Sequence, residues 1–195
     1  VHQTAQFTPS KHGYFTVGAT MDRTDANASN SADASSVLVP NFEDEVGTPG
    51  AWGLTGDWRT SSAWSYTAPS SFRVGLKNSA NDTLTSPVLN FSRVNASATP
   101  GALRLYFWMS GSVGGGDAVY IEAKNSSSSS WTLERTLNSL SAPSSWNYFL
   151  QGVALPELAG TTGQFRFRFV TGASSSSYFF ADHFLVWTYH ELGTG

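Results

Sequence analysis

Hydrophobic and polar residues alternate in short runs along most of this chain, and Gly, Ser, Asn or Pro separate one run from the next. In the clearest run, 164–171, three Phe residues alternate with polar neighbours, which is the period of a strand with one buried face. Such runs predict strands over 36–39, 63–66, 72–76, 83–89, 102–109, 118–123, 131–137, 146–153, 164–171 and 178–189. A single helical turn is predicted at Pro156–Leu158.

Consecutive strands joined by short turns pair in the antiparallel direction. The chain is therefore predicted to be all-β, with two antiparallel sheets packed face to face as a sandwich. The predicted core contains Phe107, Val119, Ile121, Phe165, Phe167 and Phe169.

Residues 1–35 have a different pattern and are interpreted as an N-terminal extension to a domain that covers 36–190. Segment 22–36 is polar and has the composition of a linker, and a β-prone strand, 13–20, precedes it. A tethered strand of this kind either folds back on its own sandwich or adds to the sheet of a neighbour. The residues predicted to mediate such assembly are Tyr14, Phe15, Val17 and Ala19.

The composition of the chain limits the classes of binding partner that we expect. Charged residues make up 13% of the chain, about half the share of roughly 25% usual in globular proteins, and the net charge is −3. There is no Lys/Arg cluster to bind nucleic acid, and no apolar stretch approaches the roughly 18 residues that span a membrane. We therefore expect neither a nucleic-acid partner nor membrane insertion.

The chain contains no cysteine, which taken alone fits the cytosol, but it contains five N-x-Ser/Thr sequons. These predict N-linked glycans on Asn27, Asn81, Asn90, Asn95 and Asn125. The sequence also opens at Val1 rather than Met, as a processed chain does after removal of a signal peptide. Together these features favour a secreted protein at an extracellular surface.

Catalytic motifs are missing from the sequence. There is no G-x-S-x-G nucleophile motif, and two of the four histidines, His2 and His12, lie in the N-terminal extension. His183 lies in a Phe-rich predicted strand, where a structural role is favoured over catalysis. We therefore expect a protein that is not an enzyme.

A colinear series of motifs between residues 41 and 188 resembles the MAM domain and its bacterial relatives, the jelly-roll modules of cell-surface and carbohydrate-binding proteins. The matching motifs are Phe42-Glu43, Trp52, Asp57-Trp58, Leu84-Thr85-Ser86-Pro87, Leu105 to Gly111, Trp146, Val153-Ala154-Leu155, Gln164 to Phe167 and Ala181 to Phe184. The resemblance implies a two-sheet antiparallel jelly-roll β-sandwich. Two departures are the missing cysteines and His183, which replaces the second Asp of a closing Asp-Asp pair.

The resemblance also implies a structural calcium ion, held between an acid of the first strand and an acid of the last strand. The candidate ligands are Glu43 and Asp182, with Asp44 or Asp82 as helpers. The alternatives are a pair of solvated acids, or Asp182 as the cap of a turn. His183 removes one oxygen ligand that the family pattern provides.

Aromatic residues make up 14% of the chain, more than the core alone requires. Tyr106, Trp108, Trp187 and Tyr189 alternate with core residues on two predicted strands, so they form a candidate aromatic platform. Such a row suits stacking on sugar rings or burial against another subunit. The alternative is that both sheet faces are covered within the chain.

These features predict a non-enzymatic extracellular structural glycoprotein, the subunit of a filament or surface layer. Exchange of the strand 13–20 between jelly-roll domains would build a head-to-tail homopolymer or fibril. The alternative function is a carbohydrate-binding or cell-adhesion module of a larger secreted protein, with glycans as its partners.

Overall fold

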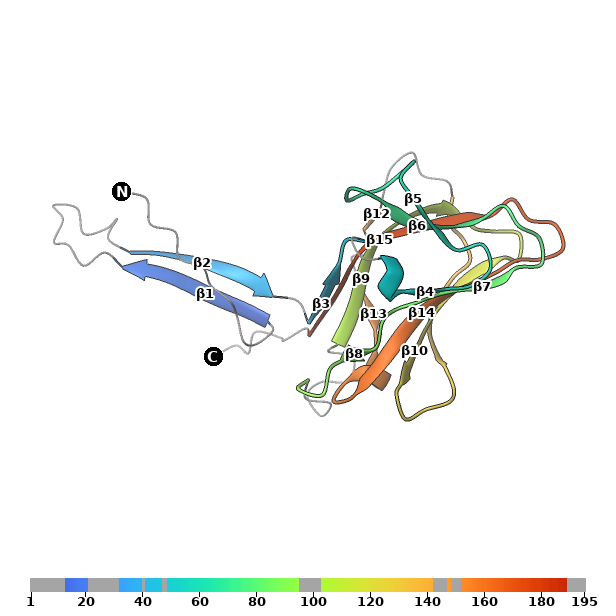
Figure 1. Ribbon diagram of the computed structural model, residues 1–195. Coiled ribbons are helices and arrows are strands. Elements are labelled where there is room, and N and C mark those ends of the chain that lie inside the picture. The colour runs from blue at the N-terminus through green and yellow to red at the C-terminus, as the bar shows by residue number, and fades with distance from the viewer. Residues whose placement is uncertain are drawn as a thin grey trace.

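The computed structural model describes residues 13–20, 32–39, 41–46, 49–94, 103–141, 147–148 and 152–188. Two antiparallel sheets pack on each other as a sandwich, and a separate two-stranded sheet lies beside them (Figure 1). The predicted all-β, two-sheet antiparallel architecture is thereby confirmed. Asn27, Asn95 and Tyr189, which the sequence singled out, lie outside the described residues.

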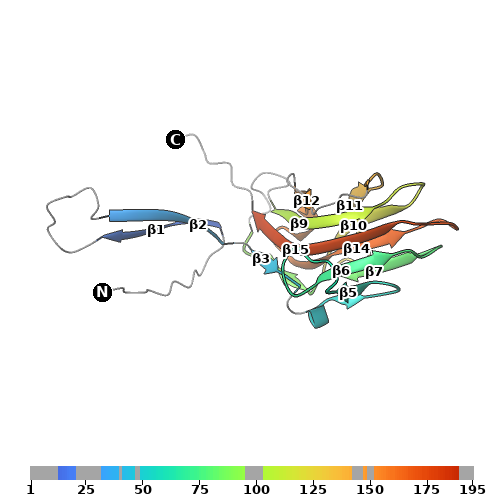
Figure 2. The ribbon, with the colours of Figure 1, turned by 90° about the horizontal axis from the view of Figure 1, so that it is seen from above.

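The first sheet of the sandwich has the strand order β11-β10-β14-β7-β4, with β8 paired to β14. Its strands are β4 (Gly53–Leu54), β7 (Asn81–Thr85), β8 (Leu89–Asn90), β10 (Ala118–Asn125), β11 (Thr132–Leu137) and β14 (Thr162–Val170). We call it the six-stranded sheet. Figure 2 shows its strands running alongside one another under the second sheet.

The second sheet has the order β12-β9-β15-β6-β5, with β13 paired to β9 and β3 paired to β15. Its strands are β3 (Phe42–Asp44), β5 (Arg59–Ser61), β6 (Ser71–Gly75), β9 (Leu103–Ser112), β12 (Asn147–Tyr148), β13 (Val153–Ala154) and β15 (Tyr178–Thr188). We call it the seven-stranded sheet. The first and last strands of the sandwich, β3 and β15, are therefore direct neighbours.

The core lies between the two sheets and is rich in Phe. All six residues predicted for it are fully buried. The rings of Phe107 and Phe167 meet edge to face across the sandwich, with centroids 5.0 Å apart, and Phe184 packs against both. Burial of these alternate side chains explains why the run 164–171 becomes the central strand β14.

One predicted strand is wrong. Segment 63–66 forms part of the loop between β5 and β6, although its aromatic and apolar residues favour strands. The backbone N–H groups of Tyr66 and Thr67 donate to the buried Asp182 carboxylate instead of to a strand partner. A contact across 116 positions of sequence thus overrides the local preference.

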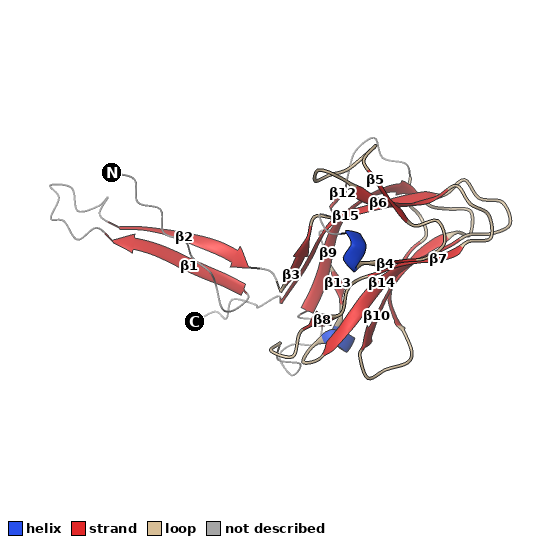
Figure 3. Ribbon diagram, viewed as in Figure 1, coloured by secondary structure: helices blue, strands red, loops and turns tan. Residues whose placement is uncertain are grey.

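Helical structure in the described chain is limited to two 3₁₀ turns, η2 (Pro49–Ala51) and η3 (Pro156–Leu158), both coloured blue in Figure 3. The second is the turn predicted from sequence. No helix among the described residues has the length and apolar character needed to cross a membrane.

The N-terminal extension contains a β-hairpin rather than one strand and a linker. Strand β1 (Gly13–Thr20) pairs antiparallel with β2 (Ala32–Val39), with Gly13 opposite Val39. The assignment of 32–36 to the linker is therefore corrected, because ladder hydrogen bonds to β1 give these polar residues a strand conformation. Both ribbon views place the hairpin apart from the sandwich (Figures 1 and 2).

Candidate functional site

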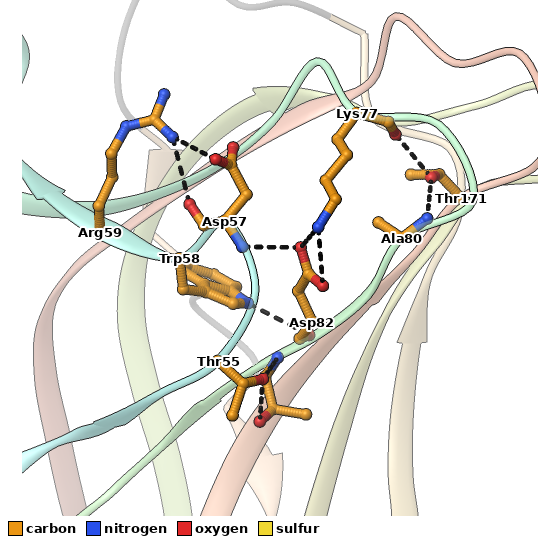
Figure 4. A network of polar contacts seen from close by, with 9 residues as sticks. Thr55, Asp57, Trp58, Arg59, Lys77, Ala80, Asp82 and Thr171 are labelled. Carbon is orange, nitrogen blue, oxygen red and sulfur yellow. Dashed lines mark hydrogen bonds and ion pairs between the residues drawn. The ribbon is translucent and has the colours of Figure 1, made fainter.

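The four carboxylates predicted to bind calcium do not lie together. Asp82 belongs to β7 of the six-stranded sheet, where its carboxylate accepts from the Asp57 N–H at 2.8 Å and pairs with the Lys77 ammonium at 3.3 Å (Figure 4). The Trp58 indole donates to the Asp82 carbonyl. Gly56, at φ +63°, passes so close that a Cβ there would collide with the Asp82 carboxylate. Asp82 thus fastens the 55–58 turn to the sheet.

Asp44 and Asp182 are also engaged by protein donors. Asp44 accepts from the Val46 N–H at 2.6 Å and from the Trp52 indole at 2.9 Å. Asp182 is fully buried and accepts from the N–H groups of Tyr66, Thr67 and His183 and from the Thr67 hydroxyl. Burial raises the pKa of Asp182, and these hydrogen bonds offset only part of that rise. This geometry matches the turn-capping alternative.

Glu43 instead contacts His183, on the adjacent strand β15. The His183 Nε2 atom lies 3.1 Å from Glu43 Oε1 and 4.0 Å from Glu45 Oε1. The three side chains each offer one ligand atom within 4.8 Å of the others. Calcium prefers an all-oxygen shell, so this cluster departs from the predicted ligand set, and calcium binding stays a prediction.

The predicted aromatic platform is corrected at Tyr106, which is buried rather than exposed. Its ring packs 4.6 Å from Trp187 and lies under Gly152, where a Cβ would meet it at 2.8 Å. Trp108 stacks against Tyr66, with centroids 3.7 Å apart and planes at 18°. The loop held by Asp182 therefore covers part of this face, and the residue left most exposed is Tyr66, at 44%.

The outer face of the six-stranded sheet has a different character. In β10 the core side chains alternate with outward-facing Tyr120, Glu122 and Lys124, and in β14 they alternate with Gln164, Arg166 and Arg168. The register places Tyr120 opposite Arg168 and Glu122 opposite Arg166. We call these outward residues, together with Trp131 immediately before β11, the β10–β14 face.

Glu122 is the charged centre of the β10–β14 face. Its side chain is only 7% exposed, and both of its oxygens accept hydrogen bonds, from Arg166 Nε at 2.6 Å and from Arg168 Nε and Nη2 at 3.1 and 3.0 Å. Burial acts to raise the pKa of Glu122, but the hydrogen bonds and charges of Arg168 and Arg166 outweigh it and leave the pKa below its usual range. The carboxylate is therefore ionised at neutral pH.

Aromatic rings pack against each cation of this face. The Arg166 guanidinium lies 4.3 Å from the Trp131 ring centroid, and the Lys124 ammonium lies 4.9 Å from the same ring. The Arg168 guanidinium lies 4.5 Å from the Tyr120 centroid. Cation–π attraction holds these long side chains in defined positions above the sheet.

The far side of the face is polar and uncharged. Thr83 and Thr85 of β7 lie opposite Arg168 and Arg166, and Gly53 of β4 lies opposite Thr85. The Thr83 and Thr55 hydroxyls are hydrogen-bonded at 3.0 Å. Across the strands, the face therefore runs from aromatic rings through a charged centre to hydroxyl groups, a combination suited to binding a polar ring compound.

The β10–β14 face was not predicted from the sequence. The alternation of Gln164, Arg166 and Arg168 was visible, and so was Glu122 between core residues at the same period. The sequence signal that could have connected these residues is an acid between apolar neighbours, Glu122, together with two Arg spaced two positions apart, Arg166 and Arg168. Which strands pair, and in which register, was not readable from either run alone.

Three predicted glycosylation sites lie in the described chain. Asn81 and Asn90 are exposed, and Asn125 is partly buried and accepts hydrogen bonds from Ser127 N and Oγ. Asn90 also borders a pocket of about 230 Å³. The lining residues of that pocket are Asn41, Asn90, Phe91, Ser92, Arg93 and Val94. Glycosylation of these asparagines stays a prediction.

Comparisons with known proteins concern the fold. No protein-family model and no curated protein matches the chain, so the resemblance to the MAM domain stays a prediction. Among solved structures, the K2 cleaved adhesin domain of Lys-gingipain superposes with a TM-score of 0.55 at 15% identity, covering 74% of this chain and 98% of that domain. The K1 cleaved adhesin domain of Lys-gingipain from Porphyromonas gingivalis W83 gives 0.55 at 17% identity, over 76% and 98%.

A xylan-binding domain from CBM 22 scores lower, with a TM-score of 0.46 at 16% identity over 76% of this chain and 94% of that domain. The adhesin domains confirm the jelly-roll sandwich for this chain. At these identities the similarity shows the fold alone.

Proposed function

We propose that this protein is a non-enzymatic, extracellular glycan-binding module that serves adhesion, and that the β10–β14 face is its binding surface. The observation that carries the proposal is Glu122, buried between Arg166 and Arg168 and flanked by the rings of Trp131 and Tyr120. The alternative function predicted from sequence is therefore favoured over the filament. The adhesin domains with the same fold support adhesion as the setting.

The chemistry of the face suits a sugar. Sugar rings present apolar C–H groups to aromatic side chains and hydroxyls to fixed hydrogen-bonding groups. Trp131 and Tyr120 are partly exposed. Glu122 orients the guanidinium groups of Arg166 and Arg168 through hydrogen bonds, and each guanidinium also packs on one of these two rings. Preorganised groups reduce the entropy lost on binding.

A glycan array followed by titration calorimetry tests this function. Substitution Trp131→Ala should weaken binding of any captured glycan by about tenfold, because one stacking ring and its apolar area are lost, roughly 1.4 kcal/mol. The matched control is Tyr66→Ala, which removes an exposed ring from the β5–β6 loop that covers the seven-stranded sheet. If Tyr66→Ala weakens binding and Trp131→Ala leaves it unchanged, the binding site lies instead at the aromatic platform predicted from sequence.

We propose self-assembly through the N-terminal hairpin as a second candidate function. It is favoured by the two-stranded sheet of β1 and β2, which pairs with no third strand among the described residues. An isolated hairpin is only marginally stable in water, and each of its outer edges offers unpaired N–H and C=O groups. A sheet edge on a second copy of the chain would satisfy those groups.

A further inference from the structure

We propose that the β10–β14 face selects acidic glycans, in which carboxylate or sulfate groups decorate the sugar. This inference rests on the proposed function and names the class of its ligand. The shared chemistry is an oxyanion on a sugar ring, and the experiment below separates the two sources.

The β10–β14 face carries a surplus of positive charge. The face gathers Lys124, Arg166 and Arg168 around a single acid, Glu122, so it carries three positive charges against one negative charge. The whole chain has the opposite balance, with a formal net charge of −3. A local surplus of positive charge on an acidic protein attracts anions to this face and away from the rest of the surface.

The β10–β14 face also has hydrogen-bond donors to spare. Within the described chain, Arg166 uses Nε toward Glu122 while both of its Nη groups have no hydrogen-bond acceptor, and Arg168 leaves Nη1 in the same state. The Lys124 ammonium contacts the Trp131 ring and forms no ion pair with another described residue. The guanidinium side chains are 20% and 28% exposed, so these remaining donors can reach a ligand.

Among the described residues, the charged centre of the face offers donors but no free carboxylate oxygen. Both oxygens of Glu122 already accept from the arginines, and the carboxylate is almost completely buried. A neutral sugar hydroxyl needs acceptors as well as donors, whereas a carboxylate or sulfate only accepts. The planar guanidinium groups also match two oxygens of such an anion. The ligand group that satisfies this charged centre is therefore rich in acceptors and negatively charged.

Two matched pairs of polysaccharides test the inference on the full chain. Polygalacturonate is compared with its methyl ester for the carboxylate arm, and dextran sulfate with dextran for the sulfate arm. In at least one arm, the charged member should bind about tenfold more tightly than the neutral member, and added salt should weaken only the charged member.

Substitution Lys124→Gln should lower affinity for the charged member by about tenfold and affinity for the neutral member by much less, because only the charged member loses an ionic contact. Lys11→Gln is the matched control, because it removes the same charge from the N-terminal extension. A preference confined to one arm identifies carboxylate or sulfate as the ligand group.

Equal binding of charged and neutral members, insensitive to Lys124→Gln, would overturn the inference and leave glycan binding intact. An equal loss in both lysine variants would also overturn it, because the attraction would then depend on overall charge. Failure to bind any glycan, on the array or among these four, would reject the proposed function together with the inference.

Discussion

Glu134, on the edge strand β11, shows how one side chain can make stability depend on pH. Its Oε1 atom is buried without a hydrogen-bond partner in the described part of the chain. Burial, and then repulsion from Glu157, raise the pKa of Glu134 to about 7. Between its ordinary pKa of 4.5 and about 7, the folded chain binds this proton more tightly than the unfolded chain does. Stability is therefore lost as the pH rises through that window.

Substitution Glu134→Gln should raise the melting temperature at pH 8 and change it little below pH 4.5, because the amide keeps the shape and removes the charge. After allowance for screening of this partly exposed group, we expect a shift of roughly 2–4 °C. Thermal melts followed by circular dichroism across the pH range measure it. Glu157→Gln, which removes only the repulsion, should give a smaller shift of the same sign. An equal gain at every pH would contradict the mechanism.

Strand β14 contributes three fully buried Phe side chains to the core. Phe167 is fully buried and contacts the rings of Phe107, Phe165, Phe179 and Phe184. Phe167→Ala should therefore lower the free energy of unfolding by about 3–5 kcal/mol, as measured by chemical denaturation. Leu133→Ala, at an apolar position that is 53% exposed, should cost less than about 0.5 kcal/mol. Similar losses in both variants would argue against this core.

The same strand shows what sequence can and cannot predict. The inward Phe residues of β14 impose a period of two, so the strand and the core could be read directly. Segment 63–66 could not, because Asp182 fixes it from more than a hundred positions away. Glu122 and Arg166 lie 44 positions apart, and only the register of β10 on β14 brings them together. The candidate site arises from strand pairing, which alternation within a single strand does not encode.

For the whole molecule, the state of association decides between the two candidate functions. If the hairpin docks on a second copy, light scattering of the full chain should show a mass that grows with concentration. Val17→Pro should abolish that growth, because proline removes a ladder hydrogen bond within β1. Ala26→Pro, between the two strands, is the control and should leave association unchanged. A wild-type chain that stays monomeric at every concentration would contradict assembly.

The pairing of β3 with β15 also determines how the sandwich would bear mechanical force. Phe42 lies opposite Val186, and the Asn41 N–H donates to the Val186 carbonyl at 2.8 Å, so the chain enters and leaves the sandwich at one end. Tension between the two flanking segments would peel these hydrogen bonds apart one at a time, which requires little force. Tension between one flanking segment and a ligand held on the β10–β14 face would instead load the Phe-rich core across both sheets. If the β10–β14 face holds the ligand, as proposed, the sandwich would resist a pull on that ligand better than a pull on its two flanking segments.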